Sequence, residues 1–393
     1  MATLDRIRDE VARLRADGVY REPPVLTGRQ GARATVQGRP VINLASNNYL
    51  GLATHPRLVE AMVDATRRLG VGAGAVRTIV GTMEIHLELE RRLAAFKGAE
   101  SALVFQSGFA TNLAVVPNVA GEGDGIFSDA LNHASIIDGC RQARAEVVRF
   151  AHADPGDLER QLKAHRGRFR NSVVITDGVF SMDGDVAPLP DLVALAEAHD
   201  AAVYVDDAHG SGVMGPGGRG TVAHFGLEGR VDVQVGTLSK AIGVLGGYVA
   251  TSRPLVELLE QRGRPFLFST SHPPGVAAAC LAALDVLADE PARIERLWAN
   301  TRHFKAGLKA LGFDTGRSQT PITPVMAFDE RRALALSDQL LEAGVFAQGI
   351  VFPTVARGQA RVRTIVTAEH TTADLDEALR AFAKAGRALG LIS

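Results

Sequence analysis

The sequence has few cysteines, almost no net charge and no long apolar run, and each shortage excludes a class of protein. Only two of its 393 residues are cysteines, Cys140 and Cys280; two cannot build a disulfide scaffold and favour a reducing compartment. The 43 basic and 44 acidic residues give a net charge of −1 and form no basic block, which argues against nucleic acid as a partner. No apolar run reaches the roughly 20 residues that span a membrane, so no membrane partner is expected.

Signals for secretion, metal binding and dinucleotide binding are also missing. Met1–Arg6 is charged and lacks the apolar stretch of a secretory signal, so we expect a soluble, cytoplasmic protein. Potential metal ligands alternate between Glu84 and Glu90, which scatters them around a predicted helix and predicts no metal site. Gly70–Ala75 and Gly215–Gly220 are rich in glycine, but neither directly joins a strand to a helix, as a dinucleotide-binding turn must.

The chain does contain enough apolar residues, 46% of the total, to bury a large core. From about residue 55 to 275, short apolar runs alternate with helical segments. Several runs are apolar throughout, as in strands buried on both faces of a parallel sheet. The expected strands are 102–105, 125–127, 147–148, 173–176, 202–205, 233–235 and 248–250. This pattern predicts an α/β fold with a mostly parallel, seven-stranded central sheet and helices on both faces.

The pattern changes toward both ends of the chain. An amphipathic helix is expected over residues 3–18, and the segment after it is rich in proline, glycine and arginine. After about residue 285, long helices alternate with only a few strands. We therefore expect an N-terminal helix and extended segment over 1–45, a large α/β domain over 46–285, and a smaller α+β domain over 286–393.

Polar residues follow the ends of the predicted strands, where open α/β sheets bind ligands. Asp206 follows the strand at 202–205, and a carboxylate leaving a buried strand is costly unless it meets a cation or a metal. Lys240 follows the strand at 233–235 among small, uncharged residues, where desolvation can lower its pKa. Taken alone, each residue has an ordinary structural explanation: Asp206 as a turn aspartate and Lys240 as a solvated lysine. Together they fit pyridoxal phosphate (PLP), which needs a lysine for a Schiff base and an aspartate at its pyridine nitrogen.

Other strand ends offer the remaining groups that this cofactor needs. Ser107–Phe109 opens a helical segment and supplies hydroxyl and backbone donors for a phosphate, and Thr237 offers another hydroxyl. His133 offers an imidazole that can stack on the ring, although a structural histidine is the more common explanation. Ser181 also lies beyond a predicted strand. Five strand ends thus converge on the needs of one cofactor.

Longer motifs resemble the α-oxoamine synthases, a fold-type I PLP family that condenses an amino acid with an acyl-CoA. The resemblance runs from Asn47–Leu52 to Arg361–Arg363 and so covers nearly the full length. Its most specific motifs are Asn132–Gly139, Gly178–Asp185, Val205–Gly210 and Gly236–Ala241. The resemblance implies a fold-type I transferase that works as a homodimer, with active sites at the subunit interface.

The resemblance also implies a role for each matching residue around the cofactor. Lys240 forms the Schiff base, an internal aldimine, and later removes the α-proton of the substrate, while Asp206 pairs with the pyridine nitrogen. His133 stacks on the ring and orients the substrate. The other cofactor contacts are His209 and Ser181 at the phenolic oxygen, Ser107, Gly108, Phe109 and Thr237 at the phosphate, and Ser269 and Thr270 at the phosphate of a neighbouring subunit.

Four residues besides His133 are expected to contact the substrates. Arg363 clamps the carboxylate of the amino acid through a bidentate pair, and Asn47 assists it. Thr354 and Arg21 match other positions that contact substrate in the family.

The motifs leave the acyl donor open between two members of the family. Asn132–Gly139 and Ala75–Thr82 resemble glycine C-acetyltransferase, which uses glycine and acetyl-CoA and is the first expectation, with longer acyl-CoAs also accepted. Asp207–Val213 and Ser269–Pro274 resemble 8-amino-7-oxononanoate synthase of biotin synthesis, which is the alternative. An aminotransferase on the same fold and a non-catalytic relative are remoter readings, and the intact Lys240 argues against the latter.

Overall fold

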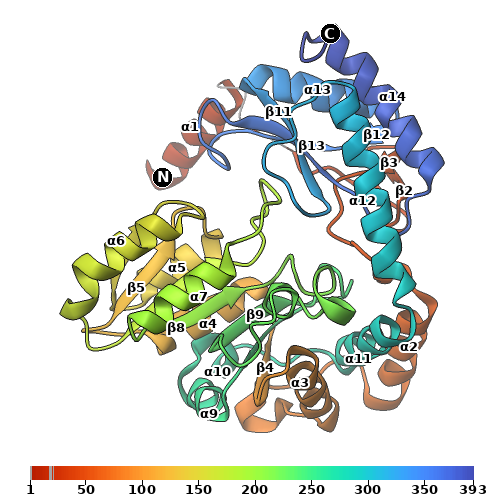
Figure 1. Ribbon diagram of the computed structural model, residues 1–393. Coiled ribbons are helices and arrows are strands. Elements are labelled where there is room, and N and C mark those ends of the chain that lie inside the picture. The colour runs from red at the N-terminus through yellow and green to blue at the C-terminus, as the bar shows by residue number, and fades with distance from the viewer. Residues whose placement is uncertain (1, 17–19, 21) are drawn as a thin grey trace.

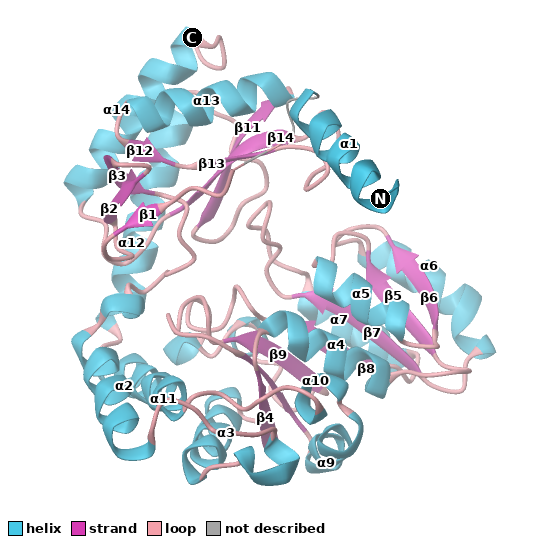
Figure 2. Cartoon of the chain, turned by 180° about the vertical axis from the view of Figure 1, so that it is seen from behind, coloured by secondary structure: helices cyan, strands magenta, loops and turns pink. Residues whose placement is uncertain are grey.

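A seven-stranded sheet forms the centre of the larger part of the molecule (Figures 1 and 2). The structure is a computed structural model that describes residues 2–16, 20 and 22–393. In spatial order the strands are β4 (Ser101–Phe105), β10 (Gly247–Thr251), β9 (Val233–Thr237), β8 (Ala202–Asp206), β7 (Ser172–Asp177), β5 (Gly125–Asp129) and β6 (Glu146–Phe150). Strand β10 is antiparallel to both its neighbours, and the other pairs are parallel. The predicted sheet and its seven strands are confirmed.

Helices cover both faces of this sheet because successive side chains of each strand point to opposite sides. Leu103 and Phe105 pack on one face and Ala102 and Val104 on the other, and all four are buried. The first face is covered by α4 (Gly108–Val119), α5 (Ala134–Gln142), α9 (Arg253–Arg262) and α10 (Arg264–Leu267). The second is covered by α2 (Pro56–Leu69), α3 (Glu84–Lys97), α6 (Pro155–His165), α7 (Leu189–Ala198), α8 (Thr221–His224) and α11 (Pro274–Asp289).

The smaller part combines the C-terminal third of the chain with strands from near its start. Its helices are α12 (Ala292–Ala310), α13 (Glu330–Glu342) and α14 (Thr372–Ala388). One sheet contains β11 (Ile322–Phe328), β14 (Ala360–Ile365) and β13 (Gln348–Ile350), and the other contains β1 (Leu26–Thr27), β2 (Arg33–Val36), β3 (Arg39–Asn43) and β12 (Val345–Phe346). Strand β3 runs parallel to β12, and Ile42 shares an apolar cluster with Phe304 and Phe382. Residues 26–43, expected in a separate N-terminal segment, therefore share the core of the C-terminal part.

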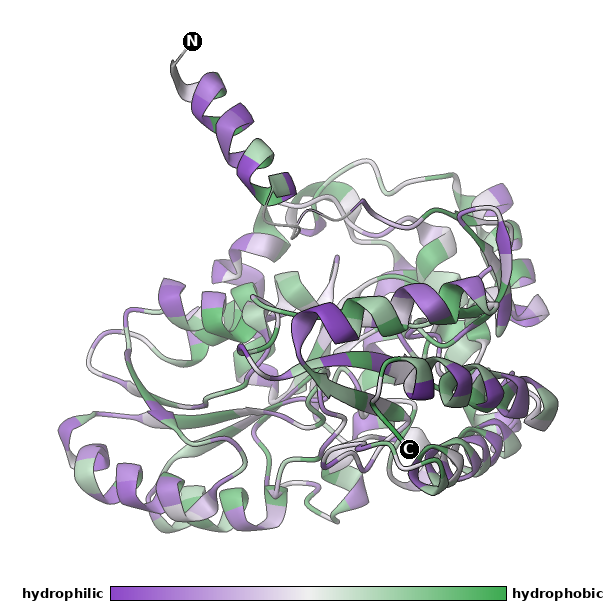
Figure 3. Cartoon of the chain, turned by 90° about the horizontal axis from the view of Figure 1, so that it is seen from above, coloured by the Kyte–Doolittle hydropathy of each residue, from purple (hydrophilic) through white to green (hydrophobic). Residues whose placement is uncertain are grey.

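Helix α1 (Ala2–Ala16) stands away from the rest of the molecule (Figure 3). It corresponds to the helix expected over 3–18, of which residues 17 and 18 lie outside the described residues. Short helical turns complete the structure: η1 (Leu52–Thr54), η3 (Arg166–Arg168) and η4 (Pro216–Gly218), and a π-helical turn, η2 (Arg77–Gly81). Within the described residues, no helix has both the length and the apolar character required to cross a bilayer.

The carboxyl ends of β5, β7, β8 and β9 lie at one edge of the large sheet, because these strands are parallel. The register places Asp177, the last residue of β7, opposite Asp206, the last residue of β8. Beyond β7 the chain forms a hairpin, residues 178–187, closed by a bridge between Val179 and Val186. In Figure 1 this hairpin rises from the sheet toward the C-terminal part, so the polar strand ends face that part of the molecule.

Candidate active site

Asp206 is a buried carboxylate with donors on both of its oxygens. Its Oδ2 accepts from Asn112 Nδ2 at 2.7 Å and its Oδ1 from the backbone N–H of Ala208 at 3.0 Å. Asn112 is itself fixed on α4, because its Oδ1 accepts from the Tyr204 hydroxyl at 2.5 Å and its Nδ2 also donates to Ser135. The side chain of Asp206 is therefore held in one orientation at the strand end.

Lys240 lies in the turn after β9, and its ammonium group is close to two carboxylates and one guanidinium. Burial lowers the pKa of Lys240 to about 8, and Arg363 acts in the same direction, although Asp206 and Asp177 oppose the shift. The side chain keeps some contact with solvent. A lysine with this pKa is partly neutral near pH 8, which makes its amine available as a nucleophile or a base.

Asp177 is a second buried carboxylate beside Asp206. Burial, and then the charge of Asp206, raise the pKa of Asp177 well above its usual range. Its Oδ2 accepts from the backbone N–H of His133 at 2.7 Å, and its own N–H donates to Asn132. Two adjacent carboxyl groups cannot both ionise at low cost, so we assign a proton to Asp177.

His133 and His209 are both neutral imidazoles at this edge. His133 caps the start of α5, with its Nδ1 accepting from the Ser135 N–H at 3.3 Å, and burial lowers its pKa. Burial, and then the charge of Lys240, lower the pKa of His209 well below its usual range. The Tyr49 hydroxyl lies 2.7 Å from His209 Nδ1. When Tyr49 donates this hydrogen bond, Nε2 of His209 carries the proton and can donate to a ligand oxygen.

The start of α4 fits a phosphate group. Ser107 Oγ accepts from the Ala110 N–H at 3.0 Å, which leaves the N–H groups of Gly108 and Phe109 without a partner inside the helix. A Cβ atom at Gly108 would lie 3.4 Å from Thr237, so the Thr237 side chain borders the same space. A Cβ at Gly247 would lie only 2.4 Å from the Gly108 nitrogen, so β10 can pass this turn only with glycine. Free amides at a helix N-terminus favour an anion there.

Arg363 on β14 is a cation without an acidic partner among the described residues. Its Nη2 donates to Asn47 Oδ1 at 3.1 Å and its Nη1 to the Ser181 carbonyl at 3.2 Å. Burial lowers its pKa, and both of its protein acceptors are neutral. A carboxylate from a substrate would therefore find an unneutralised guanidinium next to Lys240.

The other residues predicted for the site lie outside the cluster around Asp206 and Lys240. Ser181 and Thr354 line a cavity of about 700 Å³ between the 178–187 hairpin and the C-terminal part. Ser269 and Thr270 lie on the loop after α10, where the Thr270 carbonyl accepts from Gln106 at 2.8 Å. Arg21 lies outside the described residues.

Four residues of the site escaped the sequence reasoning as individual candidates: Asn112, Tyr204, Asp177 and Tyr49. Asn112 is five residues beyond Ser107 inside a predicted helix, and no local signal distinguishes it from a solvated asparagine. Tyr49 lies inside the Asn47–Leu52 motif, which gave it no role, and Asp177 directly precedes the Gly178–Asp185 motif.

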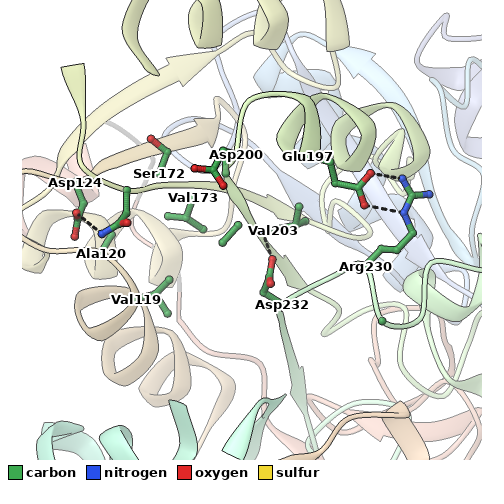
Figure 4. Close-up of a pocket in the computed structure, with 14 residues that line it drawn as sticks. Val119, Ala120, Asp124, Ser172, Val173, Glu197, Asp200, Val203, Arg230 and Asp232 are labelled. Atoms are coloured by element: carbon green, nitrogen blue, oxygen red, sulfur yellow. Dashed lines mark hydrogen bonds and ion pairs between the residues drawn. The ribbon is translucent and has the colours of Figure 1, made fainter. Parts of the chain in front are cut away.

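A second cavity, of about 620 Å³, opens at the other edge of the sheet (Figure 4). Asp124, Asp200 and Asp232 lie around it, and Arg230 pairs with Glu197. It lies at the amino ends of β7 and β8, opposite to where open α/β sheets bind their ligands. Within the described part of the chain, no three His, Cys, Asp or Glu side chains are grouped to hold a metal ion. We therefore place the active site at the carboxyl edge.

Comparison with known proteins identifies the family of the chain. The model of the family "aminotransferase class I and II" matches residues 39–382. The chain is 64% identical to an 8-amino-7-oxononanoate synthase of Symbiobacterium thermophilum, with both chains fully covered, and 58% identical to one of Thermoanaerobacter pseudethanolicus, over 99% and 98% of the two chains. A solved serine palmitoyltransferase with a PLP internal aldimine superposes with a TM-score of 0.93 at 36% identity, over 100% of this chain and 99% of that one.

These relatives correct the expected activity. The first expectation, glycine C-acetyltransferase, is wrong, because the curated relatives at 64% and 58% identity are 8-amino-7-oxononanoate synthases. The motifs quoted for the acyl donor are short segments that also resemble the other member of the family, and they do not include the residues that line the cavity of about 700 Å³ beyond Ser181. The cofactor, the fold and the acyl-transfer chemistry stand as expected. The chain belongs to the aminotransferase class I and II family of pyridoxal-phosphate enzymes and, within it, to the acyl-transferring α-oxoamine synthases.

Proposed function

We propose that the chain joins alanine to a pimeloyl thioester to give 8-amino-7-oxononanoate, CO₂ and the free thiol, a step of biotin synthesis. The observation that carries this proposal is the 64% identity over the full length to a curated enzyme of that name. Alanine Cα loses its proton and forms a bond to the acyl carbon, and its carboxylate then leaves as CO₂ and is replaced by a proton. The carbon–sulfur bond of the thioester breaks, and the thiolate leaves.

The carbon skeleton of the product identifies both substrates. The methyl carbon and the amine-bearing carbon at position 8 are what alanine retains after losing CO₂. The oxo group at position 7 marks the former thioester carbonyl. The carboxylate at the other end then requires a seven-carbon acyl chain with an acid at each end, which is pimeloyl.

The residues at the carboxyl edge can divide the work around PLP, which supplies an electron sink for the carbanion when bound. We assign the pyridine nitrogen to Asp206, ring stacking to His133, the phenolic oxygen to His209 and Ser181, and the phosphate to Ser107, Gly108, Phe109 and Thr237. The fit rests on the fixed orientation of the Asp206 carboxyl group and on the free amides at the start of α4.

Lys240 and Arg363 act on the amino acid. Arg363 binds its carboxylate, with Asn47 fixing the guanidinium, and Thr354 and Arg21 are assigned to substrate contacts. Lys240, with its pKa lowered to about 8, accepts the α-proton in its neutral form. The neutral imidazole of His133 adds no positive charge to compete for that carboxylate.

We also propose that two copies of the chain form a homodimer that shares its active sites. Two adjoining segments expose large apolar side chains: Val71, Ile79 and Val80 are 83%, 79% and 74% exposed, and Phe268 is 72% exposed. Thr270 bridges Val76, so these segments lie side by side. A contiguous apolar patch of this kind favours a protein partner. Its Thr270 segment contacts Gln106, next to the phosphate-binding turn, which supports Ser269 and Thr270 as contacts to the partner's phosphate.

The activity is tested with the purified, PLP-loaded enzyme on a panel of substrates. Alanine and glycine are each paired with pimeloyl-, acetyl- and palmitoyl-CoA, and thiol release is followed with a thiol reagent. The highest kcat/KM is expected for alanine with pimeloyl-CoA, with one CO₂ released per thiol. A preference for acetyl- or palmitoyl-CoA, or formation of a keto acid without thiol release, would overturn the proposal.

A further inference from the structure

We propose that Arg317 binds the distal carboxylate of the acyl chain and thereby selects a dicarboxylic acyl donor. This inference rests on the proposed function, because only that reaction brings such a carboxylate to the enzyme. It assigns a specificity-determining residue in the cavity of about 700 Å³ described above.

The cavity begins beside the reaction site and extends away from it. Ser181 lies in its wall, and the Ser181 carbonyl accepts from Arg363, the proposed ligand of the amino-acid carboxylate. Thr354 lies in the same wall. Apolar side chains line much of the remainder: Phe180, Met182, Met326, Phe328, Phe352 and Val355. Such walls suit the methylene groups of an acyl chain.

The charged groups in the wall are paired, with two exceptions. His152 lies between Asp129 and Asp185, at 3.0 Å and 2.8 Å. Arg361 forms an ion pair with Asp183.

Arg317 and Asp314 have no ion-pair partner among the described residues of the wall. Asp314 Oδ1 accepts from the Gly316 N–H at 2.8 Å and so shapes the turn that presents Arg317. Arg317 is thus the cation in this wall that remains available to an anionic ligand.

A carboxylate carried into apolar surroundings needs such a cation. Its desolvation is costly unless hydrogen bonds to a charged donor replace the lost water. A guanidinium can donate two parallel hydrogen bonds to one carboxylate. Arg317 is itself exposed, so solvent screens the interaction and its contribution is moderate.

The test compares two acyl donors of equal length in the PLP-loaded enzyme. Pimeloyl-CoA carries the distal carboxylate and heptanoyl-CoA lacks it. Arg317→Gln should lower kcat/KM for pimeloyl-CoA about fivefold to tenfold, mainly through KM, and leave heptanoyl-CoA unchanged. Arg317→Glu should favour 7-aminoheptanoyl-CoA over pimeloyl-CoA, a reversal that structural damage cannot produce.

Arg302→Gln is the matched control, because Arg302 is an exposed arginine on the neighbouring α12 and does not line the cavity. It should leave both donors unchanged. Equal losses for pimeloyl- and heptanoyl-CoA in Arg317→Gln, or no loss for pimeloyl-CoA, would overturn the role of Arg317 alone. A wild-type enzyme that does not prefer pimeloyl- to heptanoyl-CoA would overturn both this role and the proposed function.

Discussion

At the scale of single residues, the orientation of the Asp206 carboxyl group depends on Asn112. Asn112 links that carboxylate to Ser135 and to the Tyr204 hydroxyl, all within the core. Asp206 itself could be predicted, because it ends an apolar strand. Asn112 could not be predicted, because its contact with Asp206 arises from the packing of α4 on the sheet, and no local sequence pattern marks it.

Asn112→Ala should lower kcat/KM about tenfold to a hundredfold, because a buried carboxylate loses a charge-assisted hydrogen bond. Steady-state kinetics and PLP titration measure the effect, and weaker PLP binding is expected. Asn118→Ala is the matched control on the same helix, since Asn118 bonds only the Ala114 carbonyl. If both variants lose the same activity, Asn112 acts through helix stability and not through Asp206.

The pKa of Lys240 predicts how fast the cofactor attaches. Only the neutral amine attacks the aldehyde, so the rate of PLP attachment to the cofactor-free protein should rise with pH, with its midpoint near pH 8. Borohydride fixation followed by peptide mapping measures it. Burial also lowers the pKa of Lys305 to about 8, yet Lys305→Ala should leave the profile unchanged. A midpoint near 10 would show that Lys240 is an ordinary exposed lysine.

At the scale of elements, the hairpin over 178–187 connects the two parts of the molecule. Arg361 donates to the Met182 carbonyl and pairs with Asp183, while Arg363 holds the Ser181 carbonyl. Thr320 donates to the Gly184 carbonyl at 2.9 Å. At its base, His152 joins Asp185 of the hairpin to Asp129 at the end of β5. The sequence marked this segment as a motif but gave no sign of its partners, of which Thr320, Arg361 and Arg363 lie more than a hundred residues further along.

The stability that His152 contributes should depend on pH. Although burial opposes it, hydrogen bonds to Asp129 and Asp185 raise the pKa of His152 to about 10. A pKa raised on folding gives a contribution that is complete below the unfolded pKa of about 6.5 and is lost as pH rises toward 10. Thermal unfolding of His152→Gln should therefore differ most from wild type near pH 6, and the difference should shrink with increasing pH. His303→Gln, which breaks an exposed pair with Asp376, should change little.

The loop after β8 rests on a fully buried ion pair. Lys97 Nζ lies 2.7 Å from Asp207 Oδ2, with neither side chain exposed, and Asp207 also accepts from Thr221. Lys97→Met should destabilise the protein by about 3–5 kcal/mol, because it leaves Asp207 buried without its counter-charge. Denaturant unfolding measures this loss. Lys97→Met combined with Asp207→Asn should recover part of it. Arg68→Met, at an exposed pair with Asp64, should cost under about 1 kcal/mol.

The elements of the large sheet were predictable and those of the smaller part less so. Strands such as β7 are apolar throughout because helices cover both of their faces, and that composition is visible in the sequence. The position of β3 in the smaller part is not visible in the sequence, because it depends on a two-residue pairing with β12, three hundred residues away. A local pattern predicts that a strand forms, but not which distant strand it joins.

At the scale of the whole molecule, the proposed homodimer predicts complementation between two inactive variants. Lys240→Ala removes the reactive amine, and Ser269→Ala with Thr270→Ala removes the phosphate contacts proposed to reach the partner. If these contacts cross the interface, a mixed dimer contains one site with both defects and one intact site. Co-expressed and separated by distinct tags, mixed dimers should recover about half the activity per dimer. No recovery would place Ser269 and Thr270 in their own subunit's site.

The choice of acyl donor also depends on the assembled molecule, which is why the motifs predicted it wrongly. They are short segments, whereas the cavity proposed for the acyl chain is assembled from the hairpin, β11, the loop around Arg317 and the loop over 352–356. Thr354 was identified among these residues, but Arg317 lies in a loop with no motif at all. A residue proposed to select the acyl donor can therefore be found only in the assembled fold.

The alternation of Arg361 and Arg363 along β14 has an evolutionary consequence. Both side chains leave the same face of one strand, and each donates a hydrogen bond to one of two successive carbonyls of the 178–187 hairpin. This hairpin borders the proposed amino-acid site and also lines the proposed acyl cavity. Mutations that reshape this hairpin to admit another acyl group will also disturb the hold on the amino acid. Lineages that exchange one acyl donor for another should therefore tend to change their amino acid as well, or to restore it by a second substitution near β14.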